Sequence, residues 1–335
     1  MKILIVCSSS GGHIYPGLSL GKYLLKCGEE VSYLGIKNQI EEKIIKTNLI
    51  LVDIDNSFKK SLKTPFKTIK GIKRINQIIL EYDVIIGFGG FITFLVSRCN
   101  NINKKLFYIH EANYDLGDSN KLSLNKAKTL FTSYKNGYQK KAYYVGNPVV
   151  DDLSIIHNKK YISFVFGSLG SKTLLEKTYK YLLKQNDNNK YLLVTSDKYF
   201  NKYNELLKNK ENVKVISYAE RNYLYSNSKL IFCRGGASTL SEIINSNINC
   251  VCIPSPYVKH NHQYHNALYY FKYHCLTMVI EKEYNEDKIK ECLAYYQTKF
   301  KDMELTNQKN FKEENVCLKI YLKIKNDYNK KQFWY

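Results

Sequence analysis

The sequence predicts an α/β protein with two Rossmann-like domains, each a doubly wound parallel sheet. Three observations lead to this prediction. Short apolar runs alternate with amphipathic helical segments, which is the rhythm of βαβ units. That rhythm pauses around Gly146-Asn-Pro148 and then restarts. The length of 335 residues also favours two domains over one core.

Seven strands are expected in the first half, because seven short apolar runs alternate there with helical patterns or turns. They are residues 2–7, 30–34, 50–54, 84–86, 106–109, 129–131 and 142–145. Apolar residues at three- and four-residue steps predict helices between them, among others at 16–26, 39–47 and 65–80. Pro16 is favoured in a first turn and marks the expected start of the first helix.

The second half repeats the pattern, with strands expected at 161–166, 191–195, 213–216, 230–233, 249–253 and 276–280. From about residue 286 the chain is helical and basic. We divide it into domains at residues 1–147 and 148–335, with the last helix free to pack back on the first domain. In doubly wound sheets, ligands bind at the loops that follow the carboxyl ends of the strands.

Composition describes a globular protein with excess positive charge. Hydrophobic residues make up 44% and charged residues 24%, and the formal net charge is +21. This charge favours anionic partners such as nucleotides or acidic lipid headgroups. No basic block is interleaved with aromatic residues as base stacking requires, so nucleic acid is not an expected partner. The uncharged, glycine-containing run of residues 84–96 is too short to span a bilayer.

The nine cysteines indicate a reducing cytoplasm, because several lie in apolar runs and no C-x-x-C pair occurs. Neither zinc nor a disulfide framework is expected from them. His260, His262 and His265 do not present three ligands on one helix face. Asp53-Ile-Asp55 is a D-x-D pattern that suits a metal, but it lies in an alternating run and we interpret it as solvent-facing. No metal or other cofactor is therefore expected.

Ser8-Ser-Ser-Gly-Gly-His13 directly follows the first expected strand, and such a loop suits a phosphate or diphosphate. Its ligand contacts are expected at Ser10, Gly11 and Gly12. The loop is not G-x-G-x-x-G and no Walker A sequence exists, which disfavours nicotinamide binding and nucleotide hydrolysis. His13 is the best general-base candidate, with a structural loop histidine as the alternative.

Two further loops follow neighbouring strands of the first half. Gly87-Phe-Gly-Gly-Phe91 follows the fourth strand, and His110-Glu-Ala-Asn113 follows the fifth. Each alone fits a tight turn, but three polar or glycine-rich loops at successive strand ends are typical of a binding edge. Gly89, Gly90 and Asn113 are candidate ligand contacts, and Glu111 is a second candidate catalytic residue.

Arg234-Gly-Gly-Ala-Ser-Thr-Leu-Ser-Glu242 is the most informative stretch of the second half. An apolar run precedes it and helical spacing follows it, so we expect a strand, a glycine turn and a helix. The first N–H groups of that helix would face an anion, and its glutamate would accept a hydrogen bond from a ribose. An ordinary turn with a serine cap is the alternative. Candidate contacts are Arg234, Ala237, Ser238, Thr239, Leu240, Ser241 and Glu242.

Two other segments of the second half offer ligand contacts. Phe166-Gly-Ser-Leu-Gly-Ser171 follows the first strand there and suits phosphate through Ser168 and backbone amides. His262-Gln-Tyr-His-Asn266 opens a helix, and the amides of Gln263 and Asn266 suit sugar hydroxyls.

Residues 65–80 form a basic amphipathic pattern with two interpretations. Phe66, Ile69 and Ile72 recur at helical steps, with lysines on other faces. The helix either packs on the core with a solvated basic face or lies on an anionic membrane.

Taken together, these loops resemble the MurG family, bacterial enzymes of glycosyltransferase family 28 that add N-acetylglucosamine to lipid I. The matching elements run in the family's order from residue 11 to 267: Gly11-Gly-His13 with Pro16-Gly17, residues 87–91, His110-Glu-x-Asn113, Gly146-Asn-Pro-Val149, Gly167-Ser168 with Gly170, Arg234-x-Gly-Ala-x-Thr-x-Ser-Glu242 and Gln263-x-x-Asn-Ala267. Seven elements in one order make the resemblance specific.

The resemblance implies a GT-B fold and inverting transfer from UDP-N-acetylglucosamine to the muramyl 4-hydroxyl of lipid I, which forms lipid II in peptidoglycan synthesis. It implies an acceptor-diphosphate site in the N-terminal domain, at Gly12, His13, Gly89 and Gly90. The C-terminal domain would hold the donor with Ser168, Ala237 to Thr239, Glu242 and Gln263, and Asn113 and Gly12 would reach it across a cleft. The enzyme would need no metal. It would bind peripherally to the anionic cytoplasmic side of the cell membrane, through residues 65–80 and its basic surface.

Two departures from the family pattern stand out. Ala112 replaces the usual glutamine, which is a mild change. Val150 replaces an arginine expected to contact the donor diphosphate, and Asp151 and Asp152 follow it. A charge-assisted contact of that kind is worth roughly 1.5–3 kcal/mol. We expect Lys172 to substitute for it.

Three rival functions stay open. Another family 28 enzyme glycosylates diacylglycerol and would share the donor loop. A catalytically inactive sugar-nucleotide sensor would keep the fold and lose activity. A UDP-sugar epimerase on the same fold would act without lipid.

Overall fold

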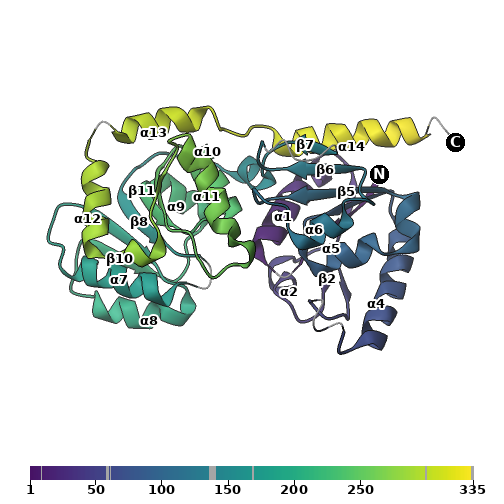
Figure 1. Cartoon of the computed structure of the whole chain (residues 1–335), viewed down its shortest axis with the longest axis horizontal. Helices are drawn as coiled ribbons and strands as arrows, with labels where there is room; N and C mark the ends of the chain where they lie inside the picture. The colour runs from purple at the N-terminus through teal and green to yellow at the C-terminus, as the bar shows by residue number, and fades with distance from the viewer. Residues whose placement is uncertain are drawn as a thin grey trace. The chain divides into compact units, whose positions relative to one another are not determined.

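The computed structural model describes residues 1–8, 10–57, 60, 62–135, 141–167, 170–298 and 300–332. The chain divides into two compact units (Figure 1). The first unit contains residues up to Asp152 and the segment from Glu313 onward, and the second is Leu153–Lys312.

The first unit is built on a parallel sheet with the strand order β3-β2-β1-β4-β5-β6-β7. Its strands are β1 (Lys2–Val6), β2 (Glu30–Ile36), β3 (Leu49–Val52), β4 (Val84–Gly87), β5 (Leu106–Glu111), β6 (Thr129–Thr132) and β7 (Ala142–Tyr144). Each of the seven strands expected in this half is confirmed, with ends that differ by up to two residues.

Helices cover both faces of this sheet, which explains why its strands are nearly continuous apolar runs. Leu4 and Val6 share a core with residues of α4 and α5, while Ile5 packs on Gly17 of α1. The helices are α1 (Gly11–Lys26), α2 (Glu41–Ile44), α4 (Pro65–Ile78), α5 (Gly90–Ser97), α6 (Asp118–Ser123) and α14 (Val316–Gln332), with the 3-10 turns η1 (Ile79–Glu81), η2 (Asn100–Lys104) and η3 (Pro148–Asp152).

Two helix predictions for this unit were wrong in extent. α1 begins at Gly11, not near Pro16, because extended Ser10 caps it and its carbonyl accepts from the N–H groups of His13 and Ile14. A proline in the second turn removes only the bond to the carbonyl of Gly12. The helix expected at 39–47 is reduced to α2, because Ile45 is extended and ends it.

The chain returns to the first unit after the second, and α14 packs there (yellow in Figure 1). Asp151 of η3 accepts hydrogen bonds from the N–H groups of Val316 and Cys317, which open α14. The positive end of the helix dipole also stabilises a carboxylate at that position. Glu313 is buried and accepts from the N–H of Asn147 at 2.8 Å.

The second unit repeats the architecture with the strand order β10-β9-β8-β11-β12-β13, again parallel. Its strands are β8 (Tyr161–Val165), β9 (Lys190–Val194), β10 (Val213–Ile216), β11 (Ser228–Cys233), β12 (Asn249–Cys252) and β13 (Thr277–Met278). The six strands expected in this half are confirmed. The helices are α7 (Lys172–Leu183), α8 (Asp197–Leu206), α9 (Arg221–Asn227), α10 (Ala237–Asn245), α11 (His262–Lys272), α12 (Glu286–Tyr295) and α13 (Phe300–Lys309), with the turns η4 (Lys259–Asn261) and η5 (Glu281–Glu283).

None of the helices in the described ranges combines the length and apolar character that crossing a bilayer requires.

Candidate active site

Each sheet has one place where the strand order reverses direction. It lies between β1 and β4 in the first unit and between β8 and β11 in the second. Loops that leave neighbouring strands in opposite directions open a crevice there, and this is where doubly wound sheets bind ligands. The loops singled out from the sequence follow these four strands and their neighbours β5 and β12.

The edge of the first sheet brings His13 against the glycine loop after β4. A Cβ added at Gly89 would lie 3.0 Å from His13 Nε2, and one added at Gly90 would lie 3.2 Å from the Ser8 carbonyl oxygen. Both glycines have positive φ, 92° and 77°. The two loops approach this closely because neither glycine carries a side chain.

Hydrogen bonds orient the His13 ring. Its Nδ1 lies 3.2 Å from the carbonyl oxygen of Ser8 and 3.2 Å from Ser10 Oγ. Because a carbonyl oxygen only accepts, the bond to Ser8 places the proton on Nδ1 and makes Nε2 the basic nitrogen. That nitrogen lies on the Gly89 side of the ring.

The loop after β1 leads directly into the N-terminus of α1, the end of a helix that binds anions. Gly11 and Gly12 are the first two residues of α1, and Gly12 is exposed. N–H groups in a first helical turn have no partner within the helix, so they favour an anion. Gly12, His13, Gly89 and Gly90 therefore lie together, as the sequence predicted.

The Glu111 carboxylate is engaged by its own loop. It accepts hydrogen bonds from N and Nδ2 of Asn113, from N of Gly117 and from Nδ2 of Asn120, all at 2.9–3.0 Å. These bonds hold the loop between β5 and α6 and orient Asn113. A buried carboxylate with four donors is suited to shaping the site, and this geometry disfavours Glu111 as the base.

Arg234, which follows β11, joins three loops of the second unit. Its guanidinium donates to Glu281 Oε2 at 2.7 Å, to the Ile253 carbonyl at 3.1 Å and to Ser171 Oγ at 2.9 Å. The side chain is mostly buried. Arg234 therefore positions the loops after β8 and β12. Ser168 lies outside the described residues.

The glycine turn after β11 is clamped by the start of α11. A Cβ at Gly235 would lie 2.2 Å from the Gln263 carbonyl oxygen, so only glycine fits there. Asn266 is fully buried and donates to the Gly235 carbonyl at 3.1 Å. Gln263 Oε1 accepts from the N–H of Ser255. Asn266 thus shapes the turn, while Gln263 keeps partial exposure.

Helix α10 begins at Ala237, as predicted, with Gly236 as its cap residue. Ser238 and Thr239 are partly exposed in its first turn, whereas the side chains of Leu240 and Ser241 lie in the interior. Leu240 and Ser241 can therefore contribute backbone only.

Glu242 has two partners that sequence reasoning missed. Arg221 Nη1 donates to Glu242 Oε1 at 2.7 Å, and Tyr225 OH donates to Oε2 at 2.7 Å. Burial, and then the neighbouring carboxylate, raise the pKa of Tyr225 well above its usual value. Both partners lie on α9, where a single arginine on a short helix gives no distinctive signal.

The structure shows the surroundings of Val150, of Asp152 two residues later and of Lys172. Val150 is buried within η3, while Asp152 accepts from Ser19 Oγ at 2.5 Å and lies 3.7 Å from Lys22 Nζ. Lys172 is exposed at the first position of α7, next to the Ser171 that Arg234 contacts.

The rejected metal patterns have ordinary partners. Asp53 is exposed and pairs with Lys67 Nζ at 2.9 Å, which lowers the pKa of Asp53, and Asp55 accepts from Thr64. His262 Nδ1 lies 2.7 Å from the Lys259 carbonyl oxygen. Within the described ranges, no group of three or more His, Cys, Asp or Glu side chains is arranged to hold a metal ion.

Comparison with known proteins identifies the family of both halves. The family models described as glycosyltransferase family 28 N-terminal and C-terminal domains match residues 3–132 and 161–319. A UDP-N-acetylglucosamine–N-acetylmuramyl-(pentapeptide) pyrophosphoryl-undecaprenol N-acetylglucosamine transferase of Caldanaerobacter subterraneus is 27% identical over 97% of this chain and 99% of that protein.

Solved structures agree on the fold. The crystal structure of Acinetobacter baumannii MurG is similar with a TM-score of 0.80 and 19% identity, over 97% of this chain and 99% of that one. A UDP-GlcNAc 2-epimerase from Methanocaldococcus jannaschii is similar with a TM-score of 0.59 and 15% identity, over 88% and 92% of the two chains. The two parallel-sheet units are therefore those of the GT-B fold, which transferases and epimerases share.

Proposed function

The chain belongs to glycosyltransferase family 28, and we propose that it transfers N-acetylglucosamine from UDP-N-acetylglucosamine to the muramyl 4-hydroxyl of lipid I, forming lipid II of peptidoglycan synthesis. The observation that carries this proposal is the close approach of His13 to Gly89 and Gly90 at the switch point of the first sheet. The basic nitrogen of His13 thus lies beside the anion-binding start of α1. An acceptor that carries both a reacting hydroxyl and a diphosphate requires both features.

The second unit would hold the donor. The first-turn N–H groups of Ala237 to Thr239 would face the diphosphate. Ser168, which lies outside the described residues, would add a second phosphate contact. A carboxylate oxygen accepts more than one hydrogen bond, so Glu242 can bind a ribose hydroxyl while it keeps Arg221 and Tyr225. Gln263 would meet the sugar hydroxyls, and Lys172 would supply the charge that Val150 lacks.

The first unit would hold the acceptor and the base. The diphosphate of lipid I would bind at Gly12, Gly89 and Gly90. His13 Nε2 takes the proton of the 4-hydroxyl as that oxygen bonds to the anomeric carbon, and the bond from this carbon to the UDP oxygen breaks with inversion. The departing charge stays on UDP, where the helix dipole and loop amides stabilise it. No metal ion is assigned to this step.

Helix α4 would place the first unit on the anionic cytoplasmic face of the membrane. Ile75 and Ile78 anchor its second half in the core, whereas Phe66 is 87% exposed and Ile69 is also exposed. Lys63, Lys67 and Lys70 are exposed on the same stretch. Each such lysine is worth about 1 kcal/mol at an anionic surface. The arrangement suits weak, peripheral attachment near a lipid-borne acceptor.

An acceptor panel tests the proposal. Radiolabelled donor is incubated with a lipid I analogue, with diacylglycerol or with no acceptor, and lipid-extractable label is counted. We expect label with lipid I alone. Label on diacylglycerol would favour the other family 28 activity, epimerised donor without lipid would favour an epimerase, and UDP binding without any product would favour a sensor.

A further inference from the structure

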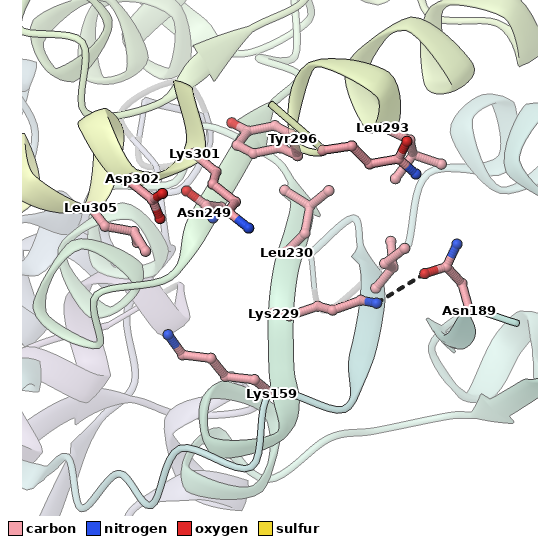
Figure 2. A pocket seen from close by; sticks show the side chains of 12 residues that line it. Lys159, Asn189, Lys229, Leu230, Asn249, Leu293, Tyr296, Lys301, Asp302 and Leu305 are labelled. Carbon is pink, nitrogen blue, oxygen red and sulfur yellow. Dashed lines mark hydrogen bonds between the residues drawn. The ribbon is translucent and has the colours of Figure 1, made fainter. Parts of the chain in front are cut away.

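The second unit contains a cavity of about 480 Å³ at the edge of its sheet opposite to the donor loops. Lys159 and Asn189 precede β8 and β9, and Lys229 and Asn249 lie at the amino ends of β11 and β12 (Figure 2). The donor loops follow the carboxyl ends of the same strands. Because β11 spans six residues, the two places are separated by about 15–20 Å.

The charged residues of the cavity favour an anion. Lys159, Lys229 and Lys301 come from three separate segments, and Asp302 is the one acidic side chain among the described lining residues. Lys229 Nζ donates to Asn189 Oδ1 at 2.9 Å, the dashed line in Figure 2, which holds its ammonium group at the wall. Separate lysines around one space present the point charges that bind phosphate.

Asn249 adds a specific requirement for a hydrogen-bond donor. Asn249 lines the cavity and is only 7% exposed. Its Oδ1 has no hydrogen-bond partner among the residues that the structure describes. Buried polar atoms in native proteins normally have a partner. A ligand hydroxyl or N–H would supply one here.

Apart from Gln297, the remaining lining side chains are apolar except for the hydroxyl of Tyr296, and contacts outside the cavity hold the tyrosine in place. Leu230, Leu293 and the ring of Tyr296 line the space (Figure 2). Tyr296 OH is held by the Cys250 carbonyl at 2.9 Å and by Glu304 Oε2 at 2.7 Å. Gln308 ties α13 to the carbonyls of Ile248 and Cys275. The cavity is thus largely preformed and within the usual size range of small-ligand sites, roughly 300–1,000 Å³.

We propose that this cavity binds a phosphomonoester carried on a hydroxylated ring, such as a sugar phosphate or a nucleoside monophosphate. The lysines hold the phosphate, Asn249 Oδ1 accepts from a ring hydroxyl, and the apolar wall packs on the face of the ring. The site is separate from the donor loops and does not depend on the proposed transfer.

Isothermal titration calorimetry tests this site. N-acetylglucosamine 1-phosphate, UMP and inorganic phosphate are each titrated into the full chain, with and without saturating UDP. With UDP saturating the donor loops, we expect one ring-bearing phosphomonoester still to bind, at one site. Whichever of the two binds more tightly identifies the ring.

Matched variants locate the binding. Lys229→Ala should weaken it at least fivefold, and Lys229→Ala with Lys301→Ala should abolish it, because both side chains are exposed and removable without loss of core packing. Lys190→Ala is the control, an exposed lysine on the neighbouring strand β9 that does not line the cavity. Absence of binding, equal weakening by Lys190→Ala, or equal affinity for inorganic phosphate alone would each overturn the proposal.

Discussion

Arg221 Nη1 lies 2.7 Å from Glu242 Oε1. Glu242 lies one to two turns into α10, the helix that follows the glycine turn of the second unit. Glu242 is only 5% exposed, so its charge needs a partner within the protein. The pair fixes the direction of the carboxylate, and Tyr225 fixes its second oxygen.

Replacing Arg221 with methionine should therefore weaken donor binding. A hydrogen bond to a charged group is worth roughly 1.5–3 kcal/mol, so we expect the donor KM to rise about 10- to 100-fold with a smaller change in kcat. The preference for UDP-N-acetylglucosamine over its 2′-deoxyribose analogue should shrink as well. Lys198→Met, at an exposed lysine of α8, is the control. An unchanged preference in Arg221→Met would separate Glu242 from ribose recognition.

The Gly89–His13 approach predicts a contrast between two glycines with similar φ. Gly28 has φ of 81° with nothing near an added Cβ, whereas a Cβ at Gly89 meets His13. Each alanine variant carries backbone strain of about 1–3 kcal/mol, visible as a lower Tm. Only Gly89→Ala should also lower kcat, because it displaces the ring. Equal kcat in the two variants would contradict the role given to this contact.

His13→Ala tests the base directly. General-base catalysis contributes about 10²–10⁴-fold, so kcat should fall by that factor while UDP affinity measured by calorimetry stays near wild type. His157→Ala, at an exposed histidine of the second unit, should leave both unchanged. A His13→Ala enzyme with full kcat would move the search for the base to another residue of the first unit.

The strands and the glycine loops could be predicted from the sequence, because buried parallel strands are apolar on both faces and loops at their ends carry their own signatures. The partners of the predicted residues could not. The sequence around Glu111 does not indicate that Asn113, Gly117 and Asn120 donate hydrogen bonds to its carboxylate. These contacts depend on how loops fold back.

Position 150 shows a second limit of sequence reasoning. The sequence shows a valine at position 150, where the family resemblance implies an arginine. It does not show that the carboxylates of the next two residues have structural partners. Asp151 opens α14 and Asp152 binds Ser19 of α1. Both bonds join segments more than a hundred residues apart, which local pattern cannot reveal.

Glu313 predicts a stability that depends on pH. Burial, the largest cause, raises its pKa from 4.5 to about 8, so the folded chain holds a proton that the unfolded chain releases between these values. Stability should therefore be full below about pH 4.5 for this group and fall as the pH rises to 8, by up to ~1.4 kcal/mol per pH unit. Denaturant unfolding should show that Glu313→Gln flattens this slope. Glu314→Gln, at an exposed neighbour, should keep it.

The exposed start of α4 predicts membrane binding that can be separated from folding. Phe66→Ser with Ile69→Ser should reduce sedimentation with vesicles of anionic lipid several-fold, because both side chains are exposed and free to insert. Tm should change little, since exposed positions contribute within about 0.5 kcal/mol. Leu183→Ser, an exposed leucine of the second unit, is the control. Undiminished vesicle binding would return α4 to a purely structural helix.

We propose that residues of this chain transfer N-acetylglucosamine to lipid I without a metal ion. The most direct measurement is the rate of radiolabel transfer from UDP-N-acetylglucosamine to a lipid I analogue, with and without EDTA. We expect transfer at the same rate under both conditions and a β-linked product. Transfer abolished by EDTA and restored by a divalent cation would contradict the metal-free mechanism, and no transfer to lipid I would contradict the proposed function.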